Sequence, residues 1–165
     1  MTLKVTDEPP DRPEWVSETI RLVSEVNDQR RGELLARVAR ASDADLTGGS
    51  DDAWGLGQIA VHLLLIERGA ALIALGLSKG ELPGNTGQPR PSAAAVTREG
   101  IASLARKAGD AAARLRAEFP AVPDTATVAR HPYYGDLNAF GWLLMVPNHY
   151  LAHLQALDTG RTSAL

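Results

Sequence analysis

The stretch VPNHYLAHLQAL, residues 146–157, is the most informative part of the sequence for the fold, because it places two histidines four residues apart in an otherwise apolar run. Residues at this spacing lie on one face of an α-helix. The same stripe passes through Trp142 and Met145, so His149 and His153 both point toward the core. An inward pair at this spacing is how a helix supplies two ligands to zinc or a similar ion.

Apolar residues recur at helical spacing in three further segments of the chain. The predicted helices cover residues 14–41, 55–77, 92–119 with Ser92 as cap, and a last segment that begins at Asp136 or Asn138 and ends near Leu157. Glycine and proline interrupt the connections between them. TATVA at 125–129 fits a short extended piece, and no strand pattern competes with the helices. The sequence therefore predicts an all-α four-helix bundle.

Length and composition limit the remaining choices. The 165 residues, 44% of them hydrophobic, suit a single domain over 1–165 with a flexible N-terminal arm at 1–12. A formal charge of −3 without a basic block argues against nucleic acid as a partner.

The most apolar segment is broken by His62, Glu67 and Arg68, which favours a buried helix over a membrane span. With no secretory signal, we expect the cytoplasm. The chain has no cysteine, so any reactive thiol must come from another molecule.

A third inward histidine lies on the second predicted helix. Residues three and four positions from His62 are Ile59, Leu65 and Ile66, which form the apolar face. A buried imidazole needs a hydrogen-bond partner or a metal to offset its lost hydration. A lone inward histidine is usually satisfied by a carbonyl group, but three of them favour a metal site. The residues between His149 and His153 include no glutamate, which excludes the HExxH metalloprotease motif.

The positions of these histidines along their helices constrain the topology. His62 lies roughly 9 Å from the start of its helix, and His153 a comparable distance from the end of the last helix, at about 1.5 Å rise per residue. They are level only if the two helices are antiparallel. That requires a crossover connection, an up-down-down-up order, and residues 79–91 could span about 40 Å when extended.

Three motifs resemble those of the DinB-like superfamily of metal-binding four-helix bundles. WGLGQIAVHLLLIE at 54–67 is similar to its tryptophan, amide or acidic residue, His-Leu and glutamate segment. HPYYGDLNAFGW at 131–142 resembles its His-Pro-aromatic-Gly turn, and NHYLAHLQAL at 148–157 its closing histidine pair. Gly55 and Gln58 depart from the pattern, because many relatives have Ser or Thr and Glu there.

The resemblance implies metal ligands at His62, His149 and His153 and a bundle with a crossover between its second and third helices. His131 matches a family position in the turn before the last helix, and we expect it to be structural. Tyr133 and Tyr134 fit loop anchors better than catalytic phenols. Glu67 is about 140° around the helix from His62 at ~100° per residue. We therefore expect it to pair with a partner helix or a surface cation.

Three imidazoles leave a coordination position open, as in catalytic zinc sites. Such a site could hydrolyse a small-molecule substrate through metal-bound hydroxide or activate a thiol. The resemblance implies transferases that depend on a low-molecular-weight thiol. Zinc, nickel and iron all suit imidazole ligands. The alternative is a non-catalytic bundle whose metal is structural or absent. Helical bundles often pair, so we also expect a homodimer.

Overall fold

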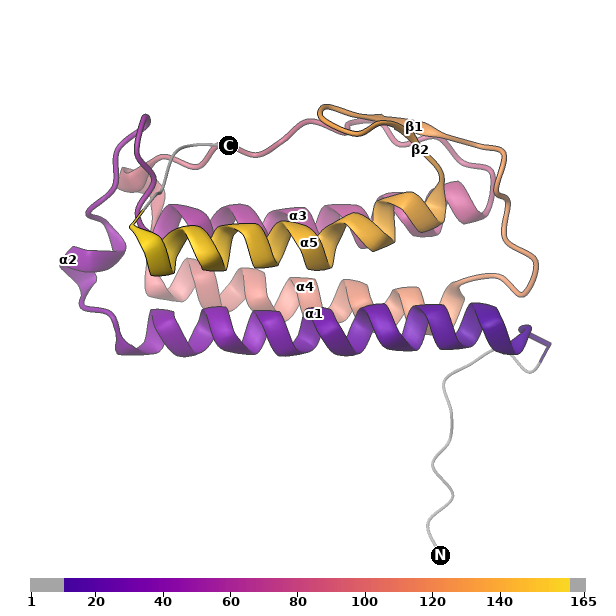
Figure 1. The fold of residues 1–165 in the computed structure, drawn as a ribbon, viewed down its shortest axis with the longest axis horizontal. Coiled ribbons are helices and arrows are strands. Elements are labelled where there is room, and N and C mark those ends of the chain that lie inside the picture. Colours follow the sequence, from indigo (N-terminus) through magenta and orange to yellow (C-terminus); the bar gives the residue numbers. More distant parts are fainter. Residues whose placement is uncertain (1–10, 161–165) are drawn as a thin grey trace, which may run out of the picture.

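Four long helices lie side by side in the computed structural model of the chain, which describes residues 11–160 (Figure 1). They are α1 (Glu14–Arg40), α3 (Leu56–Ser78), α4 (Arg98–Glu118) and α5 (Ala139–Thr159). Their apolar faces meet in one core that also includes Trp54, Val96 and Phe119 from the connections. The all-α four-helix bundle predicted from the sequence is confirmed.

The directions of the helices follow from contacts between their ends. Lys79, just after α3, binds Glu118 at the end of α4, with Nζ and Oε2 3.3 Å apart, so α3 and α4 run in the same direction. His62 in the second turn of α3 lies beside His149 and His153 in the second half of α5, so these two helices are antiparallel. Figure 1 shows the connection between α3 and α4 returning along the bundle to the end at which α3 begins.

Helix α3 forms the centre of the bundle and packs against α1, α4 and α5. Among the described residues, it is the one helix long and apolar enough to cross a membrane by length and composition, with a mean hydropathy of 1.8 in its most apolar window. Of that window, 61% is buried inside the protein. Burial against three other helices is what an apolar core helix requires, and it accounts for the composition of α3.

A close approach at Gly57 fixes the start of α3 against two other segments. A Cβ at this position would collide with the Leu46 carbonyl oxygen and a methyl group of Val96. Leu46 belongs to the short helix α2 (Asp43–Leu46), where Ser42 and Asp45 form a capping box. The predicted helices end at 41 and resume at 55, so α2 lies in a segment predicted as a connection and is a correction. Four residues provide too little periodicity for pattern recognition.

The helix predicted after Ser92 begins later than expected. Residues Ala93–Ala95 form a single 3-10 turn, η1, and α4 starts at Arg98 with Thr97 as its cap. The Thr97 side-chain oxygen accepts a hydrogen bond from the Gly100 amide at 3.0 Å. Val96 has extended backbone angles and a buried side chain, so packing of Val96 against the start of α3 interrupts the helix.

The connection before α5 contains a two-stranded antiparallel hairpin, β1 (Ala129–His131) and β2 (Gly135–Leu137). The extended piece predicted at 125–129 overlaps it only at Ala129. Gly135 has a φ of 77°, which a glycine adopts without strain at the end of the turn. Asp136 lies in β2 and is therefore not the start of α5. Asn138 caps α5 by accepting a hydrogen bond from the Gly141 amide.

Of the N-terminal arm predicted at 1–12, the structure describes only the last two residues. Residues 1–10 lie outside the described residues, but Arg12 is buried and packs against the end of α4. Its guanidinium donates from Nε to the Phe119 carbonyl oxygen at 3.1 Å and from Nη2 to the Arg116 carbonyl oxygen at 2.8 Å. These carbonyls end α4 and lack partners inside the helix, so an arginine donor satisfies them.

Candidate metal centre

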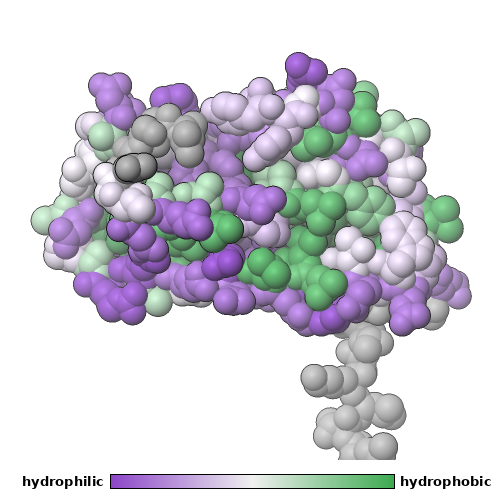
Figure 2. Space-filling model, in the orientation of Figure 1, coloured by the Kyte–Doolittle hydropathy of each residue, from purple (hydrophilic) through white to green (hydrophobic). Residues whose placement is uncertain are grey.

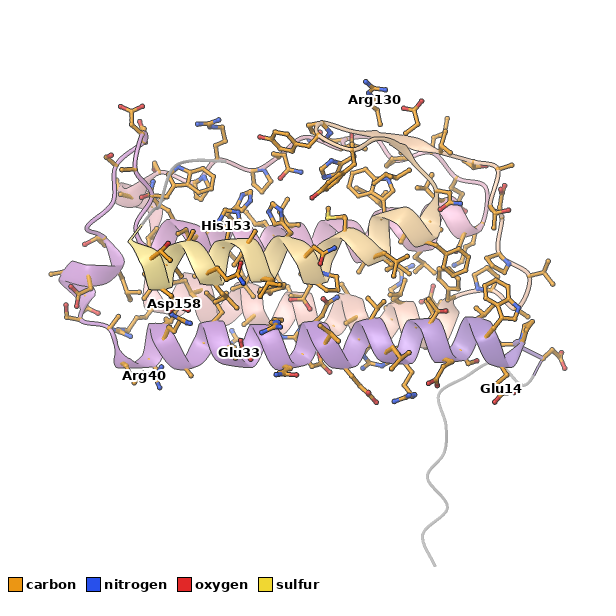
Figure 3. The ribbon with its side chains drawn as sticks, in the orientation of Figure 1. Glu14, Glu33, Arg40, Arg130, His153 and Asp158 are labelled. Carbon is orange, nitrogen blue, oxygen red and sulfur yellow. The ribbon has the colours of Figure 1, made fainter. Side chains whose placement is uncertain are left out.

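The structure brings the three predicted ligands together. The ring centroids of His62, His149 and His153 are 4.8–5.1 Å apart in each pair, so the three imidazoles form a nearly equilateral triangle. One ligand nitrogen from each ring lies within 4.8 Å of the others. His62 and His153 are buried, and His149 is partly exposed. Figure 3 shows His153 on the side of α5 that faces away from α1.

The tautomer of His62 is fixed by a backbone carbonyl. Its Nδ1 lies 2.7 Å from the carbonyl oxygen of Pro89, which can only accept, so Nδ1 carries the proton. The lone pair of Nε2 then points to the centre of the triangle, where Nε2 of His149 lies 2.8 Å away. Histidines that bind metals commonly donate their other ring nitrogen to a carbonyl group in this way.

His153 provides the test of whether a metal fits. Among residues 11–160, its Nε2 is buried and has no hydrogen-bond partner. A buried polar atom without a partner destabilises the fold unless something outside the chain completes it. The His153 ring lies beside the rings of His62 and His149, and neutral imidazole is a common metal ligand. The donor set therefore fits a divalent metal of the zinc, nickel or iron type.

The protonation states also suit a cation. Burial lowers the pKa of His149 to about 3, helped by the charges that His153 and His62 would carry, and it lowers the pKa of His153 to about 4. Burial likewise lowers the pKa of His62. All three rings are consequently neutral near pH 7, so a metal ion would release no net proton from them. Nε2 of His149, which donates to Nε2 of His62, would pass its proton to Nδ1 of the same ring.

Hydrogen bonds of Gln58, at the start of α3, hold the connection around Pro89 in place (the Pro89 segment). Gln58 accepts a hydrogen bond from the Gly55 amide and donates from Nε2 to the carbonyl oxygens of Ser50 and Pro91, each at 3.1 Å. Gln58 therefore caps α3 and also ties down the connection between α3 and α4. The buried indole of Trp54 packs 4.9 Å from His62, which keeps water from that side of the ring.

The profile of the DinB superfamily matches residues 26–157. The chain belongs to the DinB superfamily. Its fold is similar to the crystal structure of TT2238, a four-helix bundle protein, with a TM-score of 0.64 and 24% sequence identity over 85% of this chain and 98% of the other. No curated protein matches the chain.

In this DinB-superfamily chain, His131 lies outside the histidine triangle and organises the hairpin turn. Its Nδ1 accepts hydrogen bonds from the backbone amides of Tyr133 and Tyr134, at 3.1 and 3.3 Å. Its Nε2 lies 3.2 Å from the side-chain amide of Gln88. Both tyrosine side chains are exposed, and His131 is buried. The histidine therefore anchors the turn, whereas the sequence predicted that the tyrosines would do so.

Glu67 takes part in a buried network between three helices, which confirms the predicted partner-helix role. Oε1 pairs with the guanidinium of Arg31 on α1, and Oε2 accepts a hydrogen bond from the Tyr150 hydroxyl on α5 at 2.6 Å. Burial raises the pKa of Glu67, and the two partners oppose that shift. Because Tyr150 follows His149 directly, this network braces the ligand-bearing turn of α5.

Several of these partners were not recognised in the sequence. Arg31 and Tyr150 look like surface and core residues by spacing alone, and Pro89 contributes through its backbone, which carries no side-chain signal. Gln88 and Arg90 lie in a glycine- and proline-rich connection. The guanidinium of Arg90 lies over the Trp54 ring, 5.9 Å from its centroid, and its charge contributes to the lowered pKa of His62.

Proposed function

We propose that this protein is a divalent-metal-dependent enzyme that transfers a group to or from a low-molecular-weight thiol, with His62, His149 and His153 as the metal ligands. The observation that carries the proposal is Nε2 of His153, which is buried without a hydrogen-bond partner among the described residues, in a ring that lies beside two other imidazoles. A metal-dependent hydrolase is the second reaction class compatible with the same ligands. The substrate would be a small molecule.

A bound metal with three protein ligands supplies Lewis-acid chemistry at an open position, where it lowers the pKa of a coordinated water or thiol. The residues of this chain prepare that position. Pro89 holds His62 in the tautomer that presents Nε2, and Trp54 excludes water behind the ring. The network of Glu67 and Tyr150 resists movement of α5 against α3.

Elemental analysis of the purified protein beside four histidine variants tests the ligand set. We expect about one metal per chain in the unaltered protein and in His131→Asn, and loss of the metal in His62→Ala, His149→Ala and His153→Ala. Circular dichroism must show that the variants remain folded. A folded protein that takes up no zinc, nickel, iron or cobalt would contradict the proposal.

Thiol binding separates the enzyme from the alternative, a bundle in which a metal is only structural. In the cobalt-loaded protein, a thiol that enters the open position is expected to produce a sulfur-to-metal charge-transfer band near the ultraviolet. A closed structural site would bind cobalt without that band. Hydrolysis of activated esters with no thiol band would favour the hydrolase.

The proposal includes a cytoplasmic homodimer. Apolar side chains gather on the face formed by α1 and α5 (Figure 2). Exposed apolar residues on these two helices include Leu22, Val26 and Leu144. Exposed apolar patches of this kind commonly mark protein interfaces. Sedimentation of the protein beside Leu144→Glu tests the dimer, which the charged variant should dissociate.

A further inference from the structure

A small cavity lies between α3, α5 and the connection at residues 85–89. Its volume is about 90 Å³. The walls are mostly apolar and are formed by Leu65, Ile66, Gly69, Ala70, Ile73, Trp142 and Met145. An apolar pocket with few polar groups is the usual form of a small-molecule site.

The cavity is next to the histidine triangle. Ile66 follows His62 by one helical turn, and Met145 precedes His149 by one turn, which corresponds to about 5.4 Å along each helix. Pro89 lines the cavity and also accepts the hydrogen bond from His62. A molecule held by one atom at the triangle would therefore lie about one helical turn from the cavity, with Pro89 bordering both.

One polar side chain at the cavity is not satisfied by the chain itself. The Gln88 amide contacts Nε2 of His131 with one terminal atom, while its other terminal atom is buried and has no hydrogen-bond partner among the described residues. Gln88 lines the cavity. A buried amide atom without a partner is costly, so a ligand that hydrogen-bonds there would stabilise the site.

We propose that this cavity selects the substrate: it takes a straight chain of three or four carbons from the molecule held at the triangle, and Gln88 binds a polar group at the end of that chain. The size limit follows from a cavity of 150 Å³, which holds the six carbons of benzene, so 90 Å³ holds about three or four. This specificity rests on the proposed thiol chemistry.

Gly69 offers a clean way to alter the cavity. It lies in the middle of α3, and an added Cβ would have no atom within 4 Å, so alanine introduces a methyl group into free space. Glycine inside a helix is less stable than alanine, so the variant should fold at least as well. Gly32 in α1 has equally free space and does not line the cavity, which makes Gly32→Ala the matched control.

The test titrates cobalt-loaded protein with straight-chain thiols from methanethiol to hexanethiol and follows the charge-transfer band. We expect affinity to rise about fourfold per carbon, the equivalent of ~0.8 kcal/mol per methylene, and to stop rising after three or four carbons. Gly69→Ala should move that limit one carbon lower, and Gly32→Ala should leave it unchanged. An affinity independent of chain length, or one that rises through hexanethiol in both variants, overturns the proposal. Absence of the band for every thiol instead overturns the thiol chemistry on which it rests.

The role of Gln88 is tested by comparing butanethiol with 3-mercaptopropanol, which replaces the terminal methyl with a hydroxyl. We expect the two affinities to agree within about threefold in the unaltered protein, because Gln88 offsets the lost hydration of the hydroxyl. In Gln88→Leu, 3-mercaptopropanol should bind at least roughly tenfold more weakly than butanethiol. The same ratio of the two affinities in the unaltered protein and in Gln88→Leu would show that Gln88 does not bind the end of the chain.

Discussion

Tyr150 donates its hydroxyl to Oε2 of Glu67 at 2.6 Å, across the interface between α5 and α3. The tyrosine directly follows His149, and Glu67 lies five residues after His62. Both residues are buried. The helices that carry the candidate ligands are thus joined by a polar contact, which apolar packing alone would not keep in a single register.

Removing that hydroxyl should destabilise the fold. In Tyr150→Phe the carboxylate of Glu67 keeps Arg31 but loses one buried hydrogen bond, for which we expect a loss of about 1–3 kcal/mol in the free energy of unfolding. Urea unfolding measures it. Tyr133→Phe is the control, since this side chain is exposed, and should change stability by less than about 0.5 kcal/mol. Equal stability of the two variants would show that the contact contributes nothing.

The ion pair between Arg31 and Glu67 should give a pH-dependent effect. Arg31→Ala leaves a buried carboxylate without its cation, which we expect to cost about 3–5 kcal/mol at pH 8. Burial already raises the pKa of Glu67 above 4.5 in the folded protein, and loss of the cation raises it further. The folded state then holds a proton that the unfolded state releases, so stability is retained at low pH and lost as pH rises through the folded pKa.

Unfolding of Arg31→Ala at pH 5 and pH 8 measures this dependence. The deficit relative to the unaltered protein should be smaller at pH 5. Arg130→Ala is the matched control, because the pair of Arg130 with Asp136 is largely exposed and should contribute about 0–1 kcal/mol at either pH. A deficit that grows on acidification would mean that Glu67 is not the group responsible.

The parts of the structure predicted from the sequence are those that local spacing determines. Helical periodicity predicted the four helices, and the i,i+4 spacing of His149 and His153, with His62 on an apolar face, predicted a shared site. The hairpin and α2 were not predicted, since a strand of three residues shows no reliable pattern. The start of α4 depends on packing of Val96 against Gly57, a contact between residues distant in the sequence.

The groups that support the site were less predictable, because their partners lie far away in the sequence. The partner of His62 is a backbone oxygen 27 residues away, and Arg31 is 36 residues from Glu67. No local pattern of side chains indicates either contact. The bonds of Gln58 to Ser50 and Pro91 likewise join residues 8 and 33 positions apart, which no local pattern indicates.

Those two bonds can be removed with a nearly isosteric change. Gln58→Glu keeps the oxygen that accepts from the Gly55 amide but brings a carboxylate against the carbonyls of Ser50 and Pro91, which it cannot serve as a donor. We expect a loss of about 1–3 kcal/mol in unfolding free energy and weaker metal binding, because the Pro89 segment loosens. Gln155→Glu on the exposed face of α5 should change neither. Unchanged metal affinity in Gln58→Glu would show that these two hydrogen bonds do not support the metal site.

Acid should destabilise the metal-free protein through the histidine triangle. The pKa values of about 3 for His149 and about 4 for His153 lie below the ordinary 6.5 that these groups regain on unfolding. Between these values the unfolded state binds more protons, so the free energy of unfolding decreases as pH falls below 6.5 and continues to decrease toward pH 4. In His149→Gln this slope should be smaller by up to about one proton per molecule.

Calorimetry between pH 8 and pH 4, with and without a chelator, tests both the slope and the metal. A bound metal stabilises only the folded state, so the loaded protein should have the higher midpoint temperature at pH 7. Protons compete with the metal for the same nitrogens, so that advantage should disappear on acidification. In His149→Gln the chelator should make little difference at any pH. The same slope in His149→Gln as in the unaltered protein would place the titrating groups elsewhere, because removal of a buried neutral imidazole must reduce proton uptake on unfolding.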